Sequence, residues 1–135
     1  MFPPNITKLT LKGISCLNDD GMNGIGNLNK LQSLILTGCF RWRSIFDLNC
    51  IGDGFPQLQE FHVKDLPIQS WKLGDGSMPR LHILDICECH ELDSLPSELW
   101  SLTTLTKVRV QKPYNAMLTM LHNLEVKNGC ELIVE

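Results

Sequence analysis

Pairs of apolar residues separated by one position recur along the chain at nearly constant intervals. Their first members are 25, 27, 23, 24 and 24 residues apart. Alternation of apolar and polar positions predicts short strands with one buried face. A return every two dozen residues is typical of leucine-rich repeats, whose units are roughly 20–29 residues long. The pairs are Leu9-x-Leu11, Leu34-x-Leu36, Phe61-x-Val63, Leu84-x-Ile86, Val108-x-Val110 and Leu132-x-Val134.

The residues around each pair repeat as well. Apolar residues precede the pairs by three and six positions: Ile6, Leu31 and Leu28, Leu58 and Phe55, Leu81 and Met78, Leu105 and Leu102. Five positions after each first member come Ile14, Cys39, Leu66, Cys89 and Pro113. This is the pattern L-x-x-L-x-L-x-x-N/C. The sequence therefore predicts an α/β solenoid, a leucine-rich-repeat horseshoe fragment with a curved parallel sheet of about six short strands and an irregular convex arc.

The positions between the strands predict what lines the convex arc. We expect Cys89 to turn into the core, with Leu92, Leu95, Leu99 and Leu102 behind it. Equivalent spacing after Cys39 makes Trp42 and Ile45 wall residues, a reading we favour over a recognition loop built on Arg41, Trp42 and Arg43. We also expect Trp71 and Trp100 to pack along the arc.

The two ends of the chain differ. We expect about five repeats followed by a C-terminal cap at 114–135, with Asn115 capping a helix of about three turns and a last strand in "ELIVE". The helix has Met117, Met120, Leu121 and Leu124 at helical spacing. No such cap precedes Leu9. We therefore expect a single domain over 1–135 that is a fragment of a longer array, able to self-associate through its uncapped first repeat.

The side chains between the buried pairs are the candidate binding residues, because strand side chains alternate between faces. They should form columns on the concave face, the surface that repeat arrays use for protein partners. The predicted columns are Thr10, Ile35, His62, Asp85, Arg109 and Ile133; Lys8, Ser33, Glu60, Ile83, Lys107 and Glu131; and Lys12, Thr37, Lys64, Cys87, Gln111 and Glu135. The candidate protein-binding set is Lys8, Thr10, Ile35, Glu60, His62, Lys64, Asp85, Cys87, Lys107, Arg109 and Gln111.

Composition narrows the function classes. A net charge of -3 offers no electrostatic basis for binding nucleic acid or an anionic membrane. No apolar run is long enough for a signal peptide or a membrane span. Without a secretory signal, the six cysteines are expected to be reduced thiols, and the protein is expected in the cytoplasm.

The sequence offers little evidence for a metal site or a catalytic site. His82, Cys87, Cys89 and His90 lie close in sequence, but their spacing is not that of a zinc site. Asp19-Asp20 is interpreted as a capped turn. No nucleophile, base and orienting group occur together, and no glycine-rich phosphate loop is found, so we expect no enzyme activity and no cofactor in this chain.

Three stretches resemble a known family: "FPPNITKLTL", "FPQLQEFHVKDL" and "GSMPRLHILDICECHELDSLPSELWSLTTLTKVRV". With the closing helix, they are similar to the last repeats of plant nucleotide-binding leucine-rich-repeat disease-resistance proteins, particularly those with an amino-terminal coiled coil. The resemblance implies a cytoplasmic sensor of pathogen effectors that restrains receptor activation. Its partner would be an effector, a guarded host protein or the receptor's own nucleotide-binding module. ADP or ATP would bind only in that module, elsewhere in a parent protein.

A second resemblance concerns one repeat. "ISCLNDDGMNGIGNLNKLQSLILTGC" is similar to the cysteine-containing repeats of F-box proteins, which select substrates for ubiquitin ligases. Leu17, Asp19, Gly21, Met22 and Ile25 carry this likeness, whereas "LPSELWSLTTL" favours the immune-receptor reading. A further alternative is a purely structural cap that stabilises a repeat array without contacting a ligand.

Overall fold

A parallel sheet dominates the molecule. The computed structural model describes residues 3–14, 19–38, 45–50, 52–124 and 129–135. Within them, six strands form one sheet, called the main sheet here, in the order β1-β2-β4-β6-β7-β8, and β3 and β5 form a second sheet. The main-sheet strands are β1 (Lys8–Ile14), β2 (Ser33–Gly38), β4 (Glu60–Lys64), β6 (Ile83–Cys87), β7 (Lys107–Gln111) and β8 (Glu131–Val134).

The register of the main sheet follows the apolar pairs. Every neighbouring pair of strands is parallel, and each aligns the first apolar residue of one repeat with that of the next. The predicted parallel sheet of about six short strands is therefore confirmed. The aligned residues are Leu9, Leu34, Phe61, Leu84, Val108 and Leu132.

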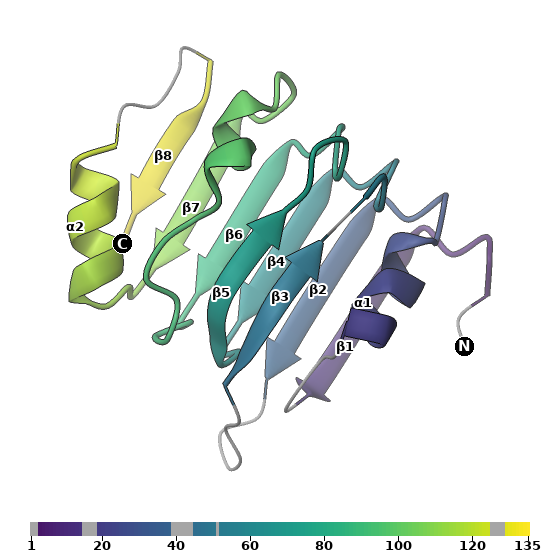
Figure 1. Ribbon diagram of the computed structural model, residues 1–135, viewed down its shortest axis with the longest axis horizontal. Coiled ribbons are helices and arrows are strands. Elements are labelled where there is room, and N and C mark those ends of the chain that lie inside the picture. The colour runs from purple at the N-terminus through teal and green to yellow at the C-terminus, as the bar shows by residue number, and fades with distance from the viewer. Residues whose placement is uncertain (1–2, 15–18, 39–44, 51, 125–128) are drawn as a thin grey trace.

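One face of the main sheet is covered by the connecting segments (Figure 1). They contain α1 (Asp19–Gly26), β3 (Phe46–Cys50), β5 (Ile68–Leu73), the 3₁₀ helix η1 (Ser97–Ser101) and α2 (Asn115–His122). The strand pairs face this layer and are almost fully buried from Leu34 to Val110. Burial of such aliphatic and aromatic side chains supplies most of the favourable free energy of folding.

The predicted arc residues mostly lie where the repeat pattern puts them. Cys89, Leu92, Leu95 and Leu99 are buried, and Trp71 is buried as well. Leu102 and Trp100 are partly buried against the same core. Trp42 lies outside the described residues. The prediction that Ile45 lies in the wall is wrong, because its side chain is 55% exposed. Ile45 precedes β3 rather than lying within it.

The arc is not irregular throughout. Strand β3 pairs with β5 in parallel, with Leu48 opposite Trp71 and Cys50 opposite Leu73. The Trp71 ring meets Phe61 of β4 edge to face, with centroids 5.8 Å apart. This aromatic contact helps pack the two sheets together, and the prediction of an irregular arc is wrong for this part of the chain.

Both helices differ from expectation. Asp19 and Asp20 open helix α1, where a capped turn was predicted, and the following Met22 and Ile25 are each 1% exposed. The need to bury those two side chains explains the helix. Helix α2 has eight residues rather than about three turns, and its N-cap is Tyr114 rather than Asn115. The predicted last strand is confirmed as β8.

Several repeats have a residue in the left-handed region directly next to the last residue of their strand. Gly13, Asp65, Glu88 and Lys112 have φ values of 71°, 54°, 56° and 54°. Each lies four positions after the first apolar residue of its repeat. Left-handed backbone is costly for residues with a Cβ, so its recurrence indicates that the backbone of these repeats turns sharply at this point.

Candidate protein-binding face

The predicted columns lie on the side of the main sheet that the connecting segments leave uncovered, called the open face here. In β4, β6 and β7 the burial alternates, with buried apolar residues on one side and partly exposed residues on the other. The strand register places Thr10, Ile35, His62, Asp85, Arg109 and Ile133 in one line across the sheet. The expected columns are confirmed as an arrangement; their role in binding stays a prediction.

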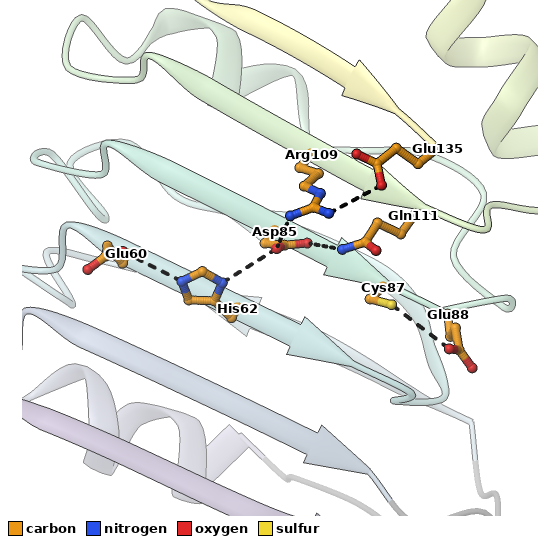
Figure 2. Close-up of polar contacts among 8 residues, drawn as sticks. All are labelled: Glu60, His62, Asp85, Cys87, Glu88, Arg109, Gln111 and Glu135. Carbon is orange, nitrogen blue, oxygen red and sulfur yellow. Dashed lines mark hydrogen bonds and ion pairs between the residues drawn. The ribbon is translucent and has the colours of Figure 1, made fainter.

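Asp85 is the centre of the polar contacts on this face (Figure 2). Its Oδ2 lies 3.7 Å from His62 Nδ1 and 3.9 Å from Arg109 Nη1. Gln111 Nε2 donates a hydrogen bond of 3.2 Å to Asp85 Oδ1. Strands β4, β6 and β7 supply these groups, so the aspartate connects three neighbouring strands through side chains alone.

The contacts continue outward on both sides of Asp85. Glu60 Oε1 lies 3.7 Å from His62 Nε2 on the same strand. Arg109 Nη2 donates a 3.2 Å hydrogen bond to Glu135 Oε2, and this bond raises the pKa of the arginine above its ordinary value. Acidic and basic side chains therefore alternate across the open face (Figure 2). Such bracketing holds the long Arg109 side chain in one place.

A hollow of about 330 Å³ opens beside this network. Strands β2, β4, β6 and β7 all contribute to its wall. Thr37, Lys64 and Gln111 offer hydrogen-bond donors there, whereas Ile35 and Cys87 offer apolar surface. A hollow of this size and mixed chemistry can accept one side chain of a partner protein. Its lining residues are Ile35, Thr37, His62, Val63, Lys64, Asp85, Cys87 and Gln111.

The Cys87 thiol is not activated. Partial burial raises its pKa, and the charge of neighbouring Glu88 raises it further. Its Sγ lies 4.0 Å from Glu88 Oε1, to which the thiol can donate. Glu88 is also paired with Lys112 Nζ at 3.4 Å. Because a thiol of raised pKa stays largely protonated at neutral pH, Cys87 is a weaker nucleophile there than an ordinary exposed cysteine.

The structure brings most of the candidate residues together. Six of them line the hollow: Ile35, His62, Lys64, Asp85, Cys87 and Gln111. Glu60 joins this group through its contact with His62, and Arg109 joins it through its ion pair with Asp85. Lys8 and Thr10 lie on β1, at the opposite edge from β8. The candidate set omits Thr37 and Glu135, although both stand in the predicted columns. Glu135 reaches Arg109 diagonally, a neighbour relation that the columns imply for long side chains.

The histidines and cysteines considered for zinc have other neighbours. His82 Nδ1 lies 3.0 Å from Thr106 Oγ1, and the His90 ring stacks on Tyr114 with centroids 4.2 Å apart. Among the described residues, no group of three or more His, Cys, Asp or Glu side chains is arranged to hold a metal ion. Cys50, Cys87 and Cys89 carry free thiols.

The helices of the molecule are short. No helix in the described part of the chain has both the length and the apolar character that a membrane crossing requires.

These features define the class of protein: the chain consists of repeats of about two dozen residues that together form one parallel sheet with a polar open face. The particular relatives are plant disease-resistance proteins. The chain is 38% identical over 97 residues to the probable disease resistance protein RF9 of Arabidopsis thaliana, covering 71% of the chain and 9% of RF9. It is 33% identical over 119 residues to the probable disease resistance protein RF45 of the same plant, covering 87% of the chain and 11% of RF45.

A further relative is the Arabidopsis thaliana disease resistance protein RPP8, 32% identical over 115 residues, which cover 82% of the chain and 12% of RPP8. No protein-family model matches the chain. The resemblance to plant disease-resistance proteins is confirmed: over most of its length, this chain is homologous to a segment of them. It spans about a tenth of the length of these relatives.

Proposed function

We propose that residues 1–135 are one leucine-rich-repeat domain, a solenoid segment from the sensing region of an intracellular plant immune receptor. The open face recognises a protein and thereby controls whether the receptor is active. The main support is the network around Asp85, in which His62, Arg109 and Gln111 meet one carboxylate beside a hollow. Homology to disease-resistance proteins supports the biological setting.

The chemistry of the open face favours a protein over a small molecule. The hollow is open, four strands line it, and Lys64 and Asp85 carry charges there, so a partner would contact charges and a pocket together. Arginine is over-represented among residues that dominate interface energies, and Arg109 is already held in place by Asp85 and Glu135. Pre-ordering of this side chain lowers the entropy cost of binding.

Two modes of recognition fit this surface. A pathogen effector can bind directly, or the open face can hold a guarded host protein whose alteration is sensed. In the resting receptor, the same surface can contact the receptor's own nucleotide-binding module and restrain it. Free thiols at Cys50, Cys87 and Cys89 suit the reducing cytoplasm in which such a receptor works.

The test uses the receptor gene that carries this chain, expressed in leaves challenged with the pathogen. Double substitution His62→Ala and Arg109→Ala removes two groups beside Asp85 without touching the core. We expect loss of pathogen-triggered cell death, or cell death without pathogen if the face restrains the receptor. The matched control is Arg80→Ala with His122→Ala, because Arg80 lies in a turn, where it donates a hydrogen bond to Gln57, and His122 lies on α2.

An unchanged response in the double variant, at equal protein level, overturns the proposal. That result would instead favour the structural-cap alternative, which needs no contact on the open face. The ubiquitin-ligase alternative has less support, because the compared relatives are disease-resistance proteins and only one repeat resembles those of F-box proteins.

A further inference from the structure

We propose that the hollow on the open face receives one glutamate side chain of the protein partner, and that Lys64 binds its carboxylate. The inference rests on the proposed function, because it names the chemistry of the partner that the open face recognises. Strands β2, β4, β6 and β7 line the hollow, and each of them is hydrogen-bonded to a neighbouring strand on both sides. The hollow therefore lies inside the main sheet and not at one of its edges.

Lys64 brings a positive charge to the hollow. It is the last residue of β4 and is exposed. In the part of the chain that the structure describes, no carboxylate forms an ion pair with Lys64. Its cross-strand neighbours are Thr37 and Cys87, neither of which is acidic, and the next residue, Asp65, is only 3% exposed. An ammonium group in this position attracts a negative group from a partner.

Asp85 also lines the hollow, but its negative charge already has partners (Figure 2). Its Oδ1 accepts a hydrogen bond from Gln111, and its Oδ2 lies near both His62 and Arg109. A cation from a partner would have to compete with Arg109 for this carboxylate. A carboxylate from a partner would reach Lys64 without displacing any of these contacts. The charges of the hollow therefore favour an acidic occupant over a basic one.

The other walls of the hollow suit a glutamate in particular. Ile35 and Cys87 contribute apolar surface, against which the two methylene groups of a glutamate can pack. Thr37 stands beside Lys64 in the strand register, and its hydroxyl can donate a hydrogen bond to the same carboxylate. An apolar side chain in the hollow would instead take water from Lys64 and Thr37 without replacing it, which costs free energy.

Three blocked five-residue peptides test the charge preference directly. Each has glycines around one central glutamate, glutamine or lysine, and each is titrated at low salt into the isotope-labelled 135-residue chain. Amide chemical shifts report where and how tightly the peptide binds. We expect the glutamate peptide to shift the amides of Thr37, Lys64 and Cys87. It should bind about five-fold more tightly than the glutamine peptide, the upper range for one exposed ion pair, and the lysine peptide should bind least.

Lys64→Met is the decisive variant, because it removes the charge and keeps an unbranched side chain. It should abolish the difference between the glutamate and glutamine peptides. Lys30→Met is the matched control, since Lys30 is exposed in the turn before β2, and it should leave the difference unchanged. Circular dichroism verifies that each variant is folded. Equal affinities of the two peptides for the wild-type chain, or a glutamate preference that survives Lys64→Met, would overturn the proposal.

A parallel experiment in leaves separates this inference from the proposed function. In the receptor, Lys64→Glu should alter pathogen-triggered cell death as strongly as the double substitution His62→Ala and Arg109→Ala. Lys64→Arg keeps the charge and should retain the wild-type response. If the double variant alters the response and Lys64→Glu does not, the glutamate assignment fails while recognition by the open face stands. If neither alters the response, both proposals fail.

Discussion

Gly38, at the end of β2, is the position where the addition of one methyl group should cost most. A Cβ on Gly38 would lie 2.0 Å from the carbonyl oxygen of Asp65 and 3.0 Å from Leu66 Cδ2. Asp65 follows β4, is 3% exposed and has a left-handed backbone. The obstacle is therefore backbone held by its own sharp turn, which cannot rotate aside as a side chain would.

The magnitude follows from this geometry. Overpacking costs typically about 1–3 kcal/mol, and a contact this short with backbone belongs at the upper end. We expect Gly38→Ala to lower the free energy of unfolding by about 3 kcal/mol and the melting temperature by about 10 °C. Gly24→Ala is the matched control, because Gly24 lies in α1 and a Cβ added there would have nothing within 4 Å. It should stabilise the chain by about 0.5–1 kcal/mol.

Urea unfolding followed by tryptophan fluorescence measures both variants, since Trp71 is buried in the native chain. Opposite signs for the two substitutions are the expected result. If Gly38→Ala changed the free energy of unfolding by less than about 0.5 kcal/mol, the close packing of the β2 and β4 ends would be refuted.

Two further predictions concern the core and the thiols. Phe61→Ala should lower the free energy of unfolding by about 3–5 kcal/mol in the same urea assay, because Phe61 is fully buried against Trp71. Tyr114→Ala removes an exposed ring that stacks on His90 and should cost about 1 kcal/mol or less. Burial raises the pKa of Cys50 to about 12 and that of Cys89 to about 11, from 9.0. In the unfolded chain these thiols ionise at lower pH than in the folded chain, so the free energy of unfolding should fall as the pH rises from 9 toward 12. In an alkylation experiment at about pH 8, peptide-resolved mass spectrometry should find Cys87 modified before Cys50 and Cys89. Equal alkylation rates would contradict the burial of Cys50 and Cys89.

The main sheet was predictable because its signal is local and repeated. Leu84-x-Ile86 alone indicates only a strand, but its recurrence indicates parallel neighbours in one register. The second sheet was missed although Trp71-x-Leu73 also alternates. In other repeats the residues of the arc, such as Leu92 and Leu95, are three positions apart. Because the same spacing was expected in every arc, the alternation at Trp71 and Leu73 was not interpreted as a strand. Helix α1 was missed because its glycines and aspartates favour turns, and tertiary burial of Met22 prevailed.

The open face was predictable as columns but not as contacts. Register alone puts Asp85 between His62 and Arg109, since the three stand at equivalent places in successive repeats. Which of these groups make contact depends on how far each side chain extends, and this cannot be read directly from the sequence. Gln111 binds Asp85 and Glu135 binds Arg109 along diagonals, which required coordinates.

Between successive strands of the main sheet, the backbone N–H one position before the first apolar residue donates to the carbonyl oxygen two positions before the first apolar residue of the preceding repeat. This shared bond has a consequence for how such genes change. Because every interface uses the same donor and acceptor positions, a whole unit can be duplicated or lost by unequal recombination and the flanking units still fit each other. Insertions of a few residues are absorbed in the connecting arcs, as the 27-residue spacing between Leu34 and Phe61 illustrates. A single residue inserted within a strand would instead turn its outward side chains inward. Variation in length thus falls outside the open face, while substitutions there remain free to diversify.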